Sequence, residues 1–429
     1  MKKILKGIGI FLALIIIIGA IFYVTKNENL PTGTKGEKAE ALANKMAKAL
    51  NYEAYNNAEV LKWSFRNQHF YKWHKSENIV EVSWDDNKVI LNTKNPKKSE
   101  VFVADKKTEN QELIQTATDY FNNDSFWLVA PFKVFDAGVE RSVVKHNNED
   151  ALLITYTSGG STPGDSYLWI LDENGFPSSY KMWTSIIPIG GIEASWSDWK
   201  KTEAGFQLPT KHKMSLFGME LDMGNVSASN PKADALANTI LKAIKHEAYK
   251  NTRFIEWSFG GRKAYKWNKQ KHIVEISWDK TKVILHPNNL EKSTVFIDNK
   301  ETLENKDKLV KRAEASFNND SFWLVAPHKL FDGGTIRNIE NINGKDALRV
   351  TYTYGGTTPG DSYVWVLDEK YVPKKYIMYL KSQIERGNTN GFSATWDEWF
   401  STESGTLLPK NHTFSGGRKL SMGAVKAYN

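Results

Sequence analysis

The most pronounced hydrophobic pattern of the chain is an uninterrupted apolar run near its start. Residues 7–24, GIGIFLALIIIIGAIFYV, hold eighteen uncharged positions in succession. At about 1.5 Å of rise per residue, a helix of this length reaches about 27 Å, which is enough to cross the hydrocarbon core of a bilayer. The run therefore predicts a single transmembrane helix.

The residues around this run predict its orientation. Lysines precede it, so the positive-inside rule places residues 1–6 in the cytoplasm and the bulk of the chain on the periplasmic side of a cell inner membrane. The run ends in Ile-Phe-Tyr-Val and offers no pair of small residues for signal-peptide cleavage. We therefore expect an uncleaved anchor. The alternative is a secreted or periplasmic protein released by signal cleavage.

After a linker, residues 25–36, the pattern becomes helical and then alternating. Four apolar residues share one helical stripe, namely Ala39, Leu42, Met46 and Leu50. Strand-like alternation follows in IVEVSW, KVILNT, ALLITYT and SYLWILD. Both faces of SYLWILD (166–172) are apolar, which predicts a strand covered on both sides. A second helix is predicted over 108–121, and turns are predicted at TPGD (162–165) and ENGF (173–176).

This whole sequence pattern occurs twice in the chain, as an internal repeat. WSF at 63–65 returns 194 positions later, and FNNDSFWLVAP at 121–131 returns 196 positions later, at 317–327. A period of this length is too long for a solenoid and indicates a duplicated domain. We predict one copy at 37–229 and a second at 230–429. Each copy is expected to be α+β, with antiparallel strands and a few helices laid on one face.

The string FNNDSFWLVAP, which both copies share, allows a structural and a functional interpretation. Phe121 is expected to end a helix, residues 122–125 to form a turn, and Pro131 to stop a short apolar run. This predicts a helix-to-strand corner held in the core by an aromatic plug. A second interpretation places Phe126 and Trp127 at the entrance of a cavity, where they bind an apolar ligand. A third gives Asp124 a catalytic role, although no histidine or other base accompanies it in both copies.

Composition and charge narrow the classes of function. The chain has 429 residues, no cysteine and a net charge of +8. Disulfides, zinc-thiolate sites and cysteine nucleophiles are therefore excluded. Residues 1–30 carry +3 of the charge, and the other lysines are scattered among acidic residues. This is typical of a solvated mixed surface, so we expect no nucleic-acid partner.

Two strings carry a resemblance to known proteins. FWLVAP (126–131) and TPGDSY (162–167) follow an N-terminal helix, Trp-rich strands and a second helix, in that order. This order resembles an uncharacterised family of bacterial envelope proteins with the LolA/LolB-like lipoprotein-carrier fold. The resemblance implies a curved antiparallel sheet, an incomplete β-barrel, with helices on its concave face and a hollow for acyl chains or lipoproteins. One arginine pair, Arg141 and Arg337, occupies matching positions, so no basic binding cluster is carried over.

Tryptophan is abundant and follows the repeat. Fourteen of the fifteen tryptophans occupy matching positions in the two copies, and Trp183 has no counterpart. They suit a packed core, an apolar pocket wall or a sugar-stacking platform, and the sequence leaves all three open. The residues that we expect to form an aromatic ligand-binding wall are Phe126, Trp127, Trp169, Phe322, Trp323 and Trp365.

Sequence motifs for catalysis and cofactor binding are missing. The chain contains no G-x-S-x-G, H-E-x-x-H, EF-hand or P-loop string, so we expect no catalytic residue, metal ligand or cofactor. His212 and His412 are the histidines at equivalent positions, and we expect both at the surface. Several aspartates recur at predicted turns, where they would bond local backbone N–H groups. A glycosidase with two carboxylates stays open, because their distance in space is not visible.

These observations predict a membrane-anchored, extracytoplasmic binding protein without enzymatic activity. Its expected ligand is a lipid, an acyl chain or a lipoprotein. One alternative is a protein-protein interaction or sensor module of the cell envelope. The other is a glycan-binding protein or glycosidase that uses the Trp-rich face. The sequence does not indicate an oligomeric state.

Overall fold

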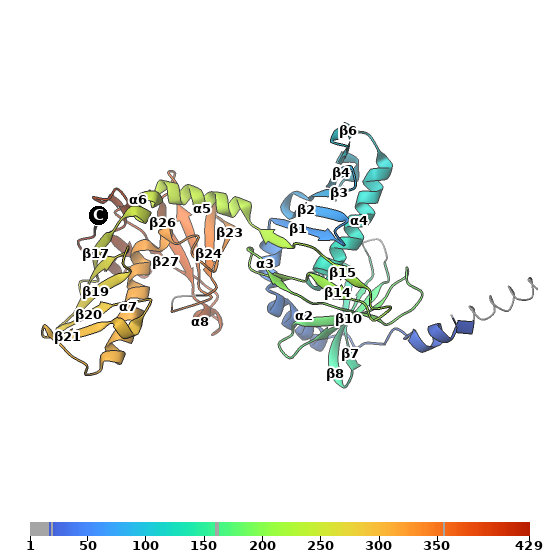
Figure 1. Ribbon diagram of the computed structural model, residues 1–429, viewed down its shortest axis with the longest axis horizontal. Helices are drawn as coiled ribbons and strands as arrows, with labels where there is room; N and C mark the ends of the chain where they lie inside the picture. Colours follow the sequence, from blue (N-terminus) through green and yellow to red (C-terminus); the bar gives the residue numbers. More distant parts are fainter. Residues whose placement is uncertain (1–16, 19, 159–162, 355–356) are drawn as a thin grey trace, which may run out of the picture. The chain divides into compact units, whose positions relative to one another are not determined.

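The computed structural model describes residues 17–18, 20–158, 163–354 and 357–429, and it divides into two compact units, Met1–Ser229 (unit 1) and Asn230–Asn429 (unit 2) (Figure 1). Most of the predicted transmembrane run lies outside the described residues, and its described end continues as a helix to residue 26. Among the described residues, no helix is both long and apolar enough to cross a membrane.

Unit 1 contains two main antiparallel sheets. The strand order of the seven-stranded sheet is β16 (Ser227–Ser229), β1 (Val60–Phe65), β2 (His69–His74), β3 (Ile79–Trp84), β4 (Asn87–Asn92), β5 (Glu100–Val103) and β6 (Lys106–Thr108). The strand order of the five-stranded sheet is β11 (Ile192–Ser195), β10 (Pro177–Trp183), β9 (Ser166–Leu171), β8 (Glu149–Tyr156) and β7 (Val139–His146).

The two sheets are joined by a small ribbon of strands. This ribbon pairs β14 (Lys211–Lys213) with β15 (Glu220–Asp222), and a second ribbon pairs β12 (Lys200–Lys201) with β13 (Gln207–Leu208). Ala194 at β11 bridges to Met214 after β14, and the N–H of Arg66 after β1 donates to the carbonyl of Asp222. The resemblance implied one curved sheet. The structure instead has two sheets, because the connecting ribbon strands are too short to continue either ladder.

Three helices of unit 1 complete the expected α+β arrangement. They are α2 (Glu37–Leu50), α3 (Tyr52–Asn57) and α4 (Gln111–Val129). Helix α2 packs on β7 and β8, and α4 packs on β4 and β5. Their buried faces and the inner faces of both sheets form one continuous core cluster. The predicted stripe of α2 is confirmed, since Ala39, Met46 and Leu50 are buried.

Unit 2 repeats this plan. Its helices are α5 (Pro231–Ala243), α6 (His246–Asn251), α7 (Lys306–Val325) and the short α8 (Lys381–Ile384). The order of its seven-stranded sheet is β22 (Lys300–Glu301), β21 (Thr294–Ile297), β20 (Thr281–Leu285), β19 (Ile273–Trp278), β18 (Lys263–Asn268), β17 (Phe254–Phe259) and β32 (Lys426–Tyr428). The order of its five-stranded sheet is β23 (Thr335–Ile342), β24 (Lys345–Tyr352), β25 (Ser362–Leu367), β26 (Pro373–Tyr379) and β27 (Phe392–Thr395). Its two ribbons pair β28 (Phe400–Ser401) with β29 (Leu407–Leu408), and β30 (Asn411–Thr413) with β31 (Lys419–Ser421).

The predicted corner at FNNDSFWLVAP is wrong. Helix α4 runs through the string to Val129, and α7 does the same to Val325. Phe121, Ser125 and Leu128 are buried at helical spacing, so packing of this face outweighs the turn preference of the Asn-Asn-Asp sequence. Pro131 lies in the short 3-10 helix that follows, where its missing N–H costs no helical hydrogen bond.

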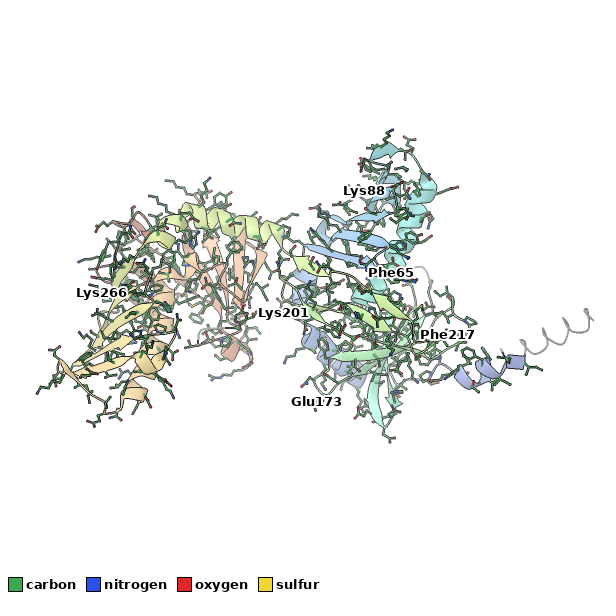
Figure 2. The ribbon with its side chains drawn as sticks, viewed as in Figure 1. Phe65, Lys88, Glu173, Lys201, Phe217 and Lys266 are labelled. Carbon is green, nitrogen blue, oxygen red and sulfur yellow. The ribbon has the colours of Figure 1, made fainter. Side chains whose placement is uncertain are left out.

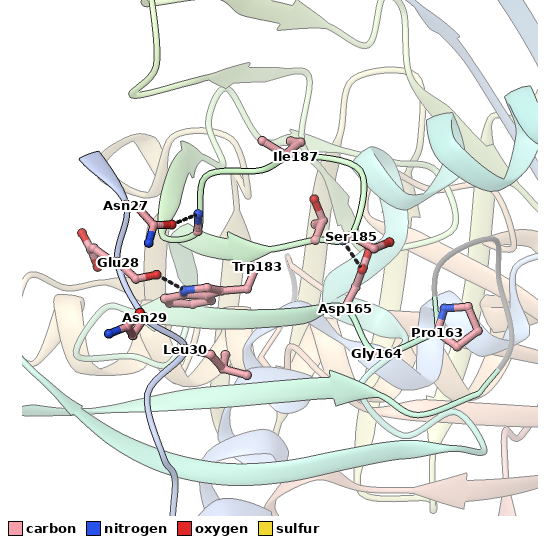
Figure 3. Close-up of a pocket in the computed structure, with 12 residues that line it drawn as sticks. Asn27, Glu28, Asn29, Leu30, Pro163, Gly164, Asp165, Trp183, Ser185 and Ile187 are labelled. Atoms are coloured by element: carbon pink, nitrogen blue, oxygen red, sulfur yellow. Dashed lines mark hydrogen bonds between the residues drawn. The ribbon is translucent and has the colours of Figure 1, made fainter. Parts of the chain in front are cut away.

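The segment expected to be a linker is fixed to unit 1 (Figure 3). We call residues 27–34 the strap. The backbone N–H of Glu28 donates to the carbonyl of Gly190 at 2.9 Å, and the Glu28 carboxylate pairs with Lys181 at 2.7 Å. Further along the strap, Thr34 forms a β-bridge with Val143. The unmatched tryptophan, Trp183, donates its indole N–H to the carbonyl of Glu28 at 2.8 Å. Trp183, which has no tryptophan counterpart in unit 2, therefore belongs to the contact between strap and sheet in unit 1.

The residues on the outer face of the five-stranded sheet also differ between the two units. In unit 1, Val144 and Leu153 are buried there, in an apolar cluster that Trp183 joins. The equivalent positions of unit 2 hold Glu340 and Arg349, which form an ion pair at 2.7 Å. The prediction that strand SYLWILD is covered on both sides is confirmed, since Leu168 on this outer face is buried.

Candidate functional site

The main candidate site is an aromatic cavity of about 820 Å³ in unit 2. In unit 1 the core between the two sheets is continuous, whereas in unit 2 it is divided into two clusters. Members of both clusters border the cavity, and Trp323 and Phe414 pack against both. The aromatic residues of its wall are Trp267, Phe317, Phe322, Trp323, Tyr352, Tyr354, Tyr363, Tyr376, Phe392 and Phe414.

Helix α7 positions the centre of this wall. Phe317 is buried against Trp267 of β18, at 5.2 Å between ring centroids. About one and a half turns further along the helix, Phe322 faces Tyr363 of β25 at 4.8 Å and Trp323 faces Tyr376 of β26 at 5.4 Å between ring centroids. This spacing turns Phe322 and Trp323 away from the side of Phe317, so α7 contacts the seven-stranded sheet through Phe317 and the five-stranded sheet through the other two rings. The copied string therefore places its aromatic residues between helix and sheet.

The six residues expected to form a ligand-binding wall fall into two layers. Phe322 and Trp323 line the unit 2 cavity, and both are partly buried. Trp365 lies behind the lining residue Tyr376, with the two ring centroids 5.1 Å apart, and is fully buried. In unit 1, Phe126 and Trp127 contact Tyr167 and Tyr180 in the same way, and Trp169 is fully buried.

Polar groups at the cavity restrict what it can hold. Tyr352 and Tyr376 line it, and their buried hydroxyl groups have no hydrogen-bond partner in the described parts of the chain. Burial raises the pKa of both tyrosines, so the hydroxyls are neutral donors. At the rim, Lys329 pairs with Asp332 at 2.5 Å. The cavity therefore suits an apolar body that carries a hydrogen-bonding group, since an unpaired buried hydroxyl is costly.

The distribution of tryptophan argues against a sugar-stacking platform. All fifteen tryptophans lie in the described ranges, and each of them is buried or partly buried. A platform needs exposed ring faces on which a sugar can stack. The abundance of tryptophan is explained by the two cores and by the cavity wall.

The expected surface position of His212 and His412 is wrong. Both are fully buried, with the ring of His212 at 4.5 Å from Trp196 and 5.3 Å from Trp127. Burial lowers the pKa of each to about 4, so both are neutral at pH 7. Each bonds a backbone carbonyl through Nδ1, that of Ser195 or of Thr395. Their sequence context, a strand start after Leu-Pro, gave no sign of this burial, because the residues that cover them come from distant elements.

Asp124 and its counterpart Asp320 have partners that the sequence did not reveal. Asp124 is buried and accepts from the hydroxyl of Tyr71 at 2.5 Å, and its carboxylate lies 2.7 Å from Nδ1 of His69. In unit 2 the equivalent partner is Lys263, whose ammonium lies 3.0 Å from Asp320. A lysine replaces the histidine, so the shared feature is a cationic or donor group beside a buried carboxylate. This indicates a structural ion pair between helix and sheet.

A third histidine offers a matched comparison between the copies. His328 stacks on Tyr249 at 4.2 Å, and Phe132 stacks on Tyr55 at 4.3 Å in unit 1. Burial, together with the nearby His246 and Lys269, lowers the pKa of His328 to about 3. Unlike Phe132, His328 therefore couples the stability of its unit to pH.

We expect the His328→Phe variant to lose less stability in acid than the wild type. Between pH 6.5 and about 3 the unfolded chain binds a proton at His328 and the folded chain does not. Stability from this group therefore falls as pH falls through that window, by up to about 1.4 kcal/mol per pH unit. Urea unfolding at pH 7 and pH 5 measures the effect. Phe132→His should introduce the same dependence in unit 1, and equal acid losses in all three proteins would contradict the prediction.

A second cavity, of about 440 Å³, lies beside the strap in unit 1 (Figure 3). It is bordered by Asn27 to Leu30, by the Pro163-Gly164-Asp165 turn and by the loop after Trp183. The carboxylate of Asp165 accepts from the backbone N–H of Ser185 at 2.9 Å, which ties the turn to the loop. A side chain at Gly190 would collide with Trp183 and with the carbonyl of Glu28, so the strap requires glycine there.

No grouping of three or more His, Asp or Glu residues able to hold a metal ion occurs in the part of the chain that the structure describes. The carboxylates near the cavity are in local contacts, with Asp332 paired to Lys329 and Asp361 accepting from the N–H of Lys381.

Two of the solved structures that are similar to this chain show how far the similarity extends. A DUF1329 family protein from Desulfovibrio piger ATCC 29098 is 11% identical, with a TM-score of 0.24, over 46% of this chain and 91% of that protein. A putative outer membrane lipoprotein-sorting protein domain from Vibrio parahaemolyticus is 9% identical, with a TM-score of 0.22, over 43% of this chain and 93% of that domain. No family model matches the chain, and no curated protein matches it.

Proposed function

We propose that this protein is a membrane-anchored, extracytoplasmic binding protein that holds an amphiphilic ligand in unit 2 without chemical conversion. The ligand is a lipid, an acyl chain or the acylated end of a lipoprotein. The observation that carries this proposal is the aromatic cavity of about 820 Å³ with two unpaired tyrosine hydroxyls in its wall. Residues 7–24 are the anchor, and the bulk of the chain lies in the periplasm.

The size and lining of the cavity support an acyl ligand. Its volume lies within the range of about 300–1,000 Å³ that is usual for small-molecule sites. Each buried methylene contributes about 0.8 kcal/mol, so ten of them supply about 8 kcal/mol before the costs of binding. This corresponds to a dissociation constant no lower than about 1 μM for that part of the ligand. A hydroxyl or carbonyl group on the ligand would add hydrogen bonds to Tyr352 and Tyr376.

Unit 2 is the binding copy in this proposal. In unit 1, three further apolar residues pack against the core between the sheets, namely Ile187, Ile189 and Leu216. The loop that holds the two isoleucines is SIIPIGG (185–191) in unit 1, and the matching stretch of unit 2, KSQIERGNTNG (381–391), is polar. Leu216 is replaced by Gly416. The side chains that close unit 1 are therefore missing from unit 2.

Lipid analysis of the purified protein tests this function. Residues 25–429, which keep the strap, are produced in a bacterial periplasm, purified without detergent and extracted for lipid mass spectrometry against a blank. We expect about one amphiphile per chain. Two per chain would mean that unit 1 also binds. A stable, monodisperse protein without lipid would contradict the proposal and favour a module that docks another envelope protein.

A further inference from the structure

Unit 1 carries a group of exposed apolar side chains at one end. Phe217 and Met219, in the turn between β14 and β15, are 86% and 47% exposed, and Ile186 in the loop after β10 is 70% exposed. We call these three residues the apolar tip. Phe217 also has a φ of 59°, a backbone conformation that an aromatic residue rarely adopts. Exposure and an unfavourable backbone conformation together indicate that this side chain is kept for a contact beyond the two sheets of the unit.

The duplicated unit shows that the fold does not require this tip. The four residues Leu216-Phe217-Gly218-Met219 in the turn of unit 1 are replaced by three, Gly416-Gly417-Arg418, in the turn of unit 2. Both turns connect the strands of a small antiparallel ribbon, and the pairs His212–Leu221 and His412–Leu420 show that the turn of unit 2 is one residue shorter. Ile186 likewise lies in a loop whose counterpart is polar. The same scaffold is therefore apolar at this end in the copy that follows residues 7–24, and polar in the other copy.

The strap brings the apolar N-terminal helix to this tip. Phe22, in the helical segment that precedes the strap, stacks on Phe217 with ring centroids 5.8 Å apart. Figure 2 shows Phe217 at the end of unit 1 from which this helix leaves. The helix continues the apolar surface, since Ile18, Ile21 and Val24 are 64%, 59% and 77% exposed. Because the strap is bonded to the sheet through Glu28, the helix has no free spacer that would separate it from the tip.

We propose that the apolar tip of unit 1 inserts into the interface of a lipid bilayer, beside the point where residues 7–24 enter it. This inference rests on the anchor assigned under the proposed function. An aromatic and a long aliphatic side chain on a tight turn bury well at the boundary between headgroups and acyl chains. The tip and the anchor together fix unit 1 at the membrane surface. Unit 2, with the cavity, carries no such surface at the equivalent turn.

Single-cysteine labelling of the full chain tests this contact, because the chain has no cysteine of its own. The variants are Phe217→Cys at the tip, Gly417→Cys at the matching turn of unit 2, and Leu12→Cys within the predicted anchor. Each is labelled with a polarity-sensitive fluorophore and reconstituted into phosphatidylcholine and phosphatidylglycerol vesicles, with or without a lipid-borne quencher. A side chain at the interface lies within about 5–10 Å of the acyl boundary, so we expect the quencher to lower the emission at positions 12 and 217 about twofold or more. We expect no loss at position 417.

The outcomes separate the tip from the anchor. Quenching at position 12 with no difference between positions 217 and 417 would overturn the membrane contact of the tip and leave the anchor in place. Quenching at position 217 without quenching at position 12 would support the tip and remove the anchor. Absence of quenching at both positions would overturn both. Circular dichroism of each labelled variant in the same vesicles confirms that the chain is folded.

Discussion

Replacement of Trp323 by alanine is expected to weaken ligand binding strongly, while replacement of Trp127 leaves it unchanged. Trp323 lies at the centre of the unit 2 cavity, where it contacts Tyr376 and Phe414 at 5.4 Å and 5.1 Å. Truncation of a central aromatic anchor typically costs about 2–4 kcal/mol of binding free energy, which is a loss of about 30-fold to 1,000-fold in affinity. Trp127 occupies the equivalent position in the same helix of unit 1 and serves as a matched control.

The measurement is a titration of each purified variant with a fluorescent fatty acid, followed by displacement with unlabelled lipid. Thermal unfolding of both variants gives the necessary control, because each truncation also removes packing from a core. If both variants lost affinity equally, unit 1 would also be a binding copy. If neither did, the aromatic cavity would not be the ligand site. Tyr352→Phe adds a finer test, because it removes one unpaired hydroxyl and leaves the wall in place.

The Trp365→Ala variant is expected to destabilise unit 2 by about 3–5 kcal/mol, the cost usually found for removal of a buried tryptophan. Trp365 is fully buried and packs on Trp396 at 5.0 Å and on Tyr376 at 5.1 Å. Its truncation opens a cavity among rigid aromatic neighbours that cannot collapse into the space. Denaturant unfolding measures the loss, and hydrogen exchange localises it to unit 2.

Trp365→Phe is the conservative control for this prediction. The indole N–H of Trp365 is buried without a partner in the described residues, so the exchange to phenylalanine gives up packing volume but no hydrogen bond. We expect it to cost clearly less than Trp365→Ala. A Trp365→Ala variant with wild-type stability and no ligand binding would show instead that Trp365 is a contact residue of the cavity, as the sequence suggested.

Much of the local structure was predictable because it depends on short-range periodicity. The α2 stripe, the alternating strands and the Asn-Gly hairpin between β9 and β10 were all visible in the hydrophobic pattern. The duplication was visible as repeated strings, and it predicted two copies of one α+β plan. The failure at FNNDSFWLVAP also has a local cause. Asn, Asp and Ser favour turns in isolation, but burial of Phe121, Ser125 and Leu128 on the sheet outweighs that preference.

The candidate site was predictable in part. Phe322 and Trp323 were selected from the copied string and line the cavity, whereas Trp365 lies in the layer behind it. The tyrosines that supply the polar groups of the wall, Tyr352 and Tyr376, were missed. Nothing distinguishes them in sequence from other strand tyrosines, because their role depends on which residues face them across the space between the sheets.

By itself the sequence determined the duplication, the α+β class, the apolar N-terminal run and the absence of cysteine chemistry. Each of these is a property of composition or of spacing along the chain. Only the structure showed what the differences between the two copies produce, namely a divided core and a cavity in unit 2, and a strap and an apolar tip in unit 1. The physical reason is that burial and partnership are set by elements far apart in sequence. The same two letters, Phe-Trp, therefore border a continuous core in one copy and a cavity in the other.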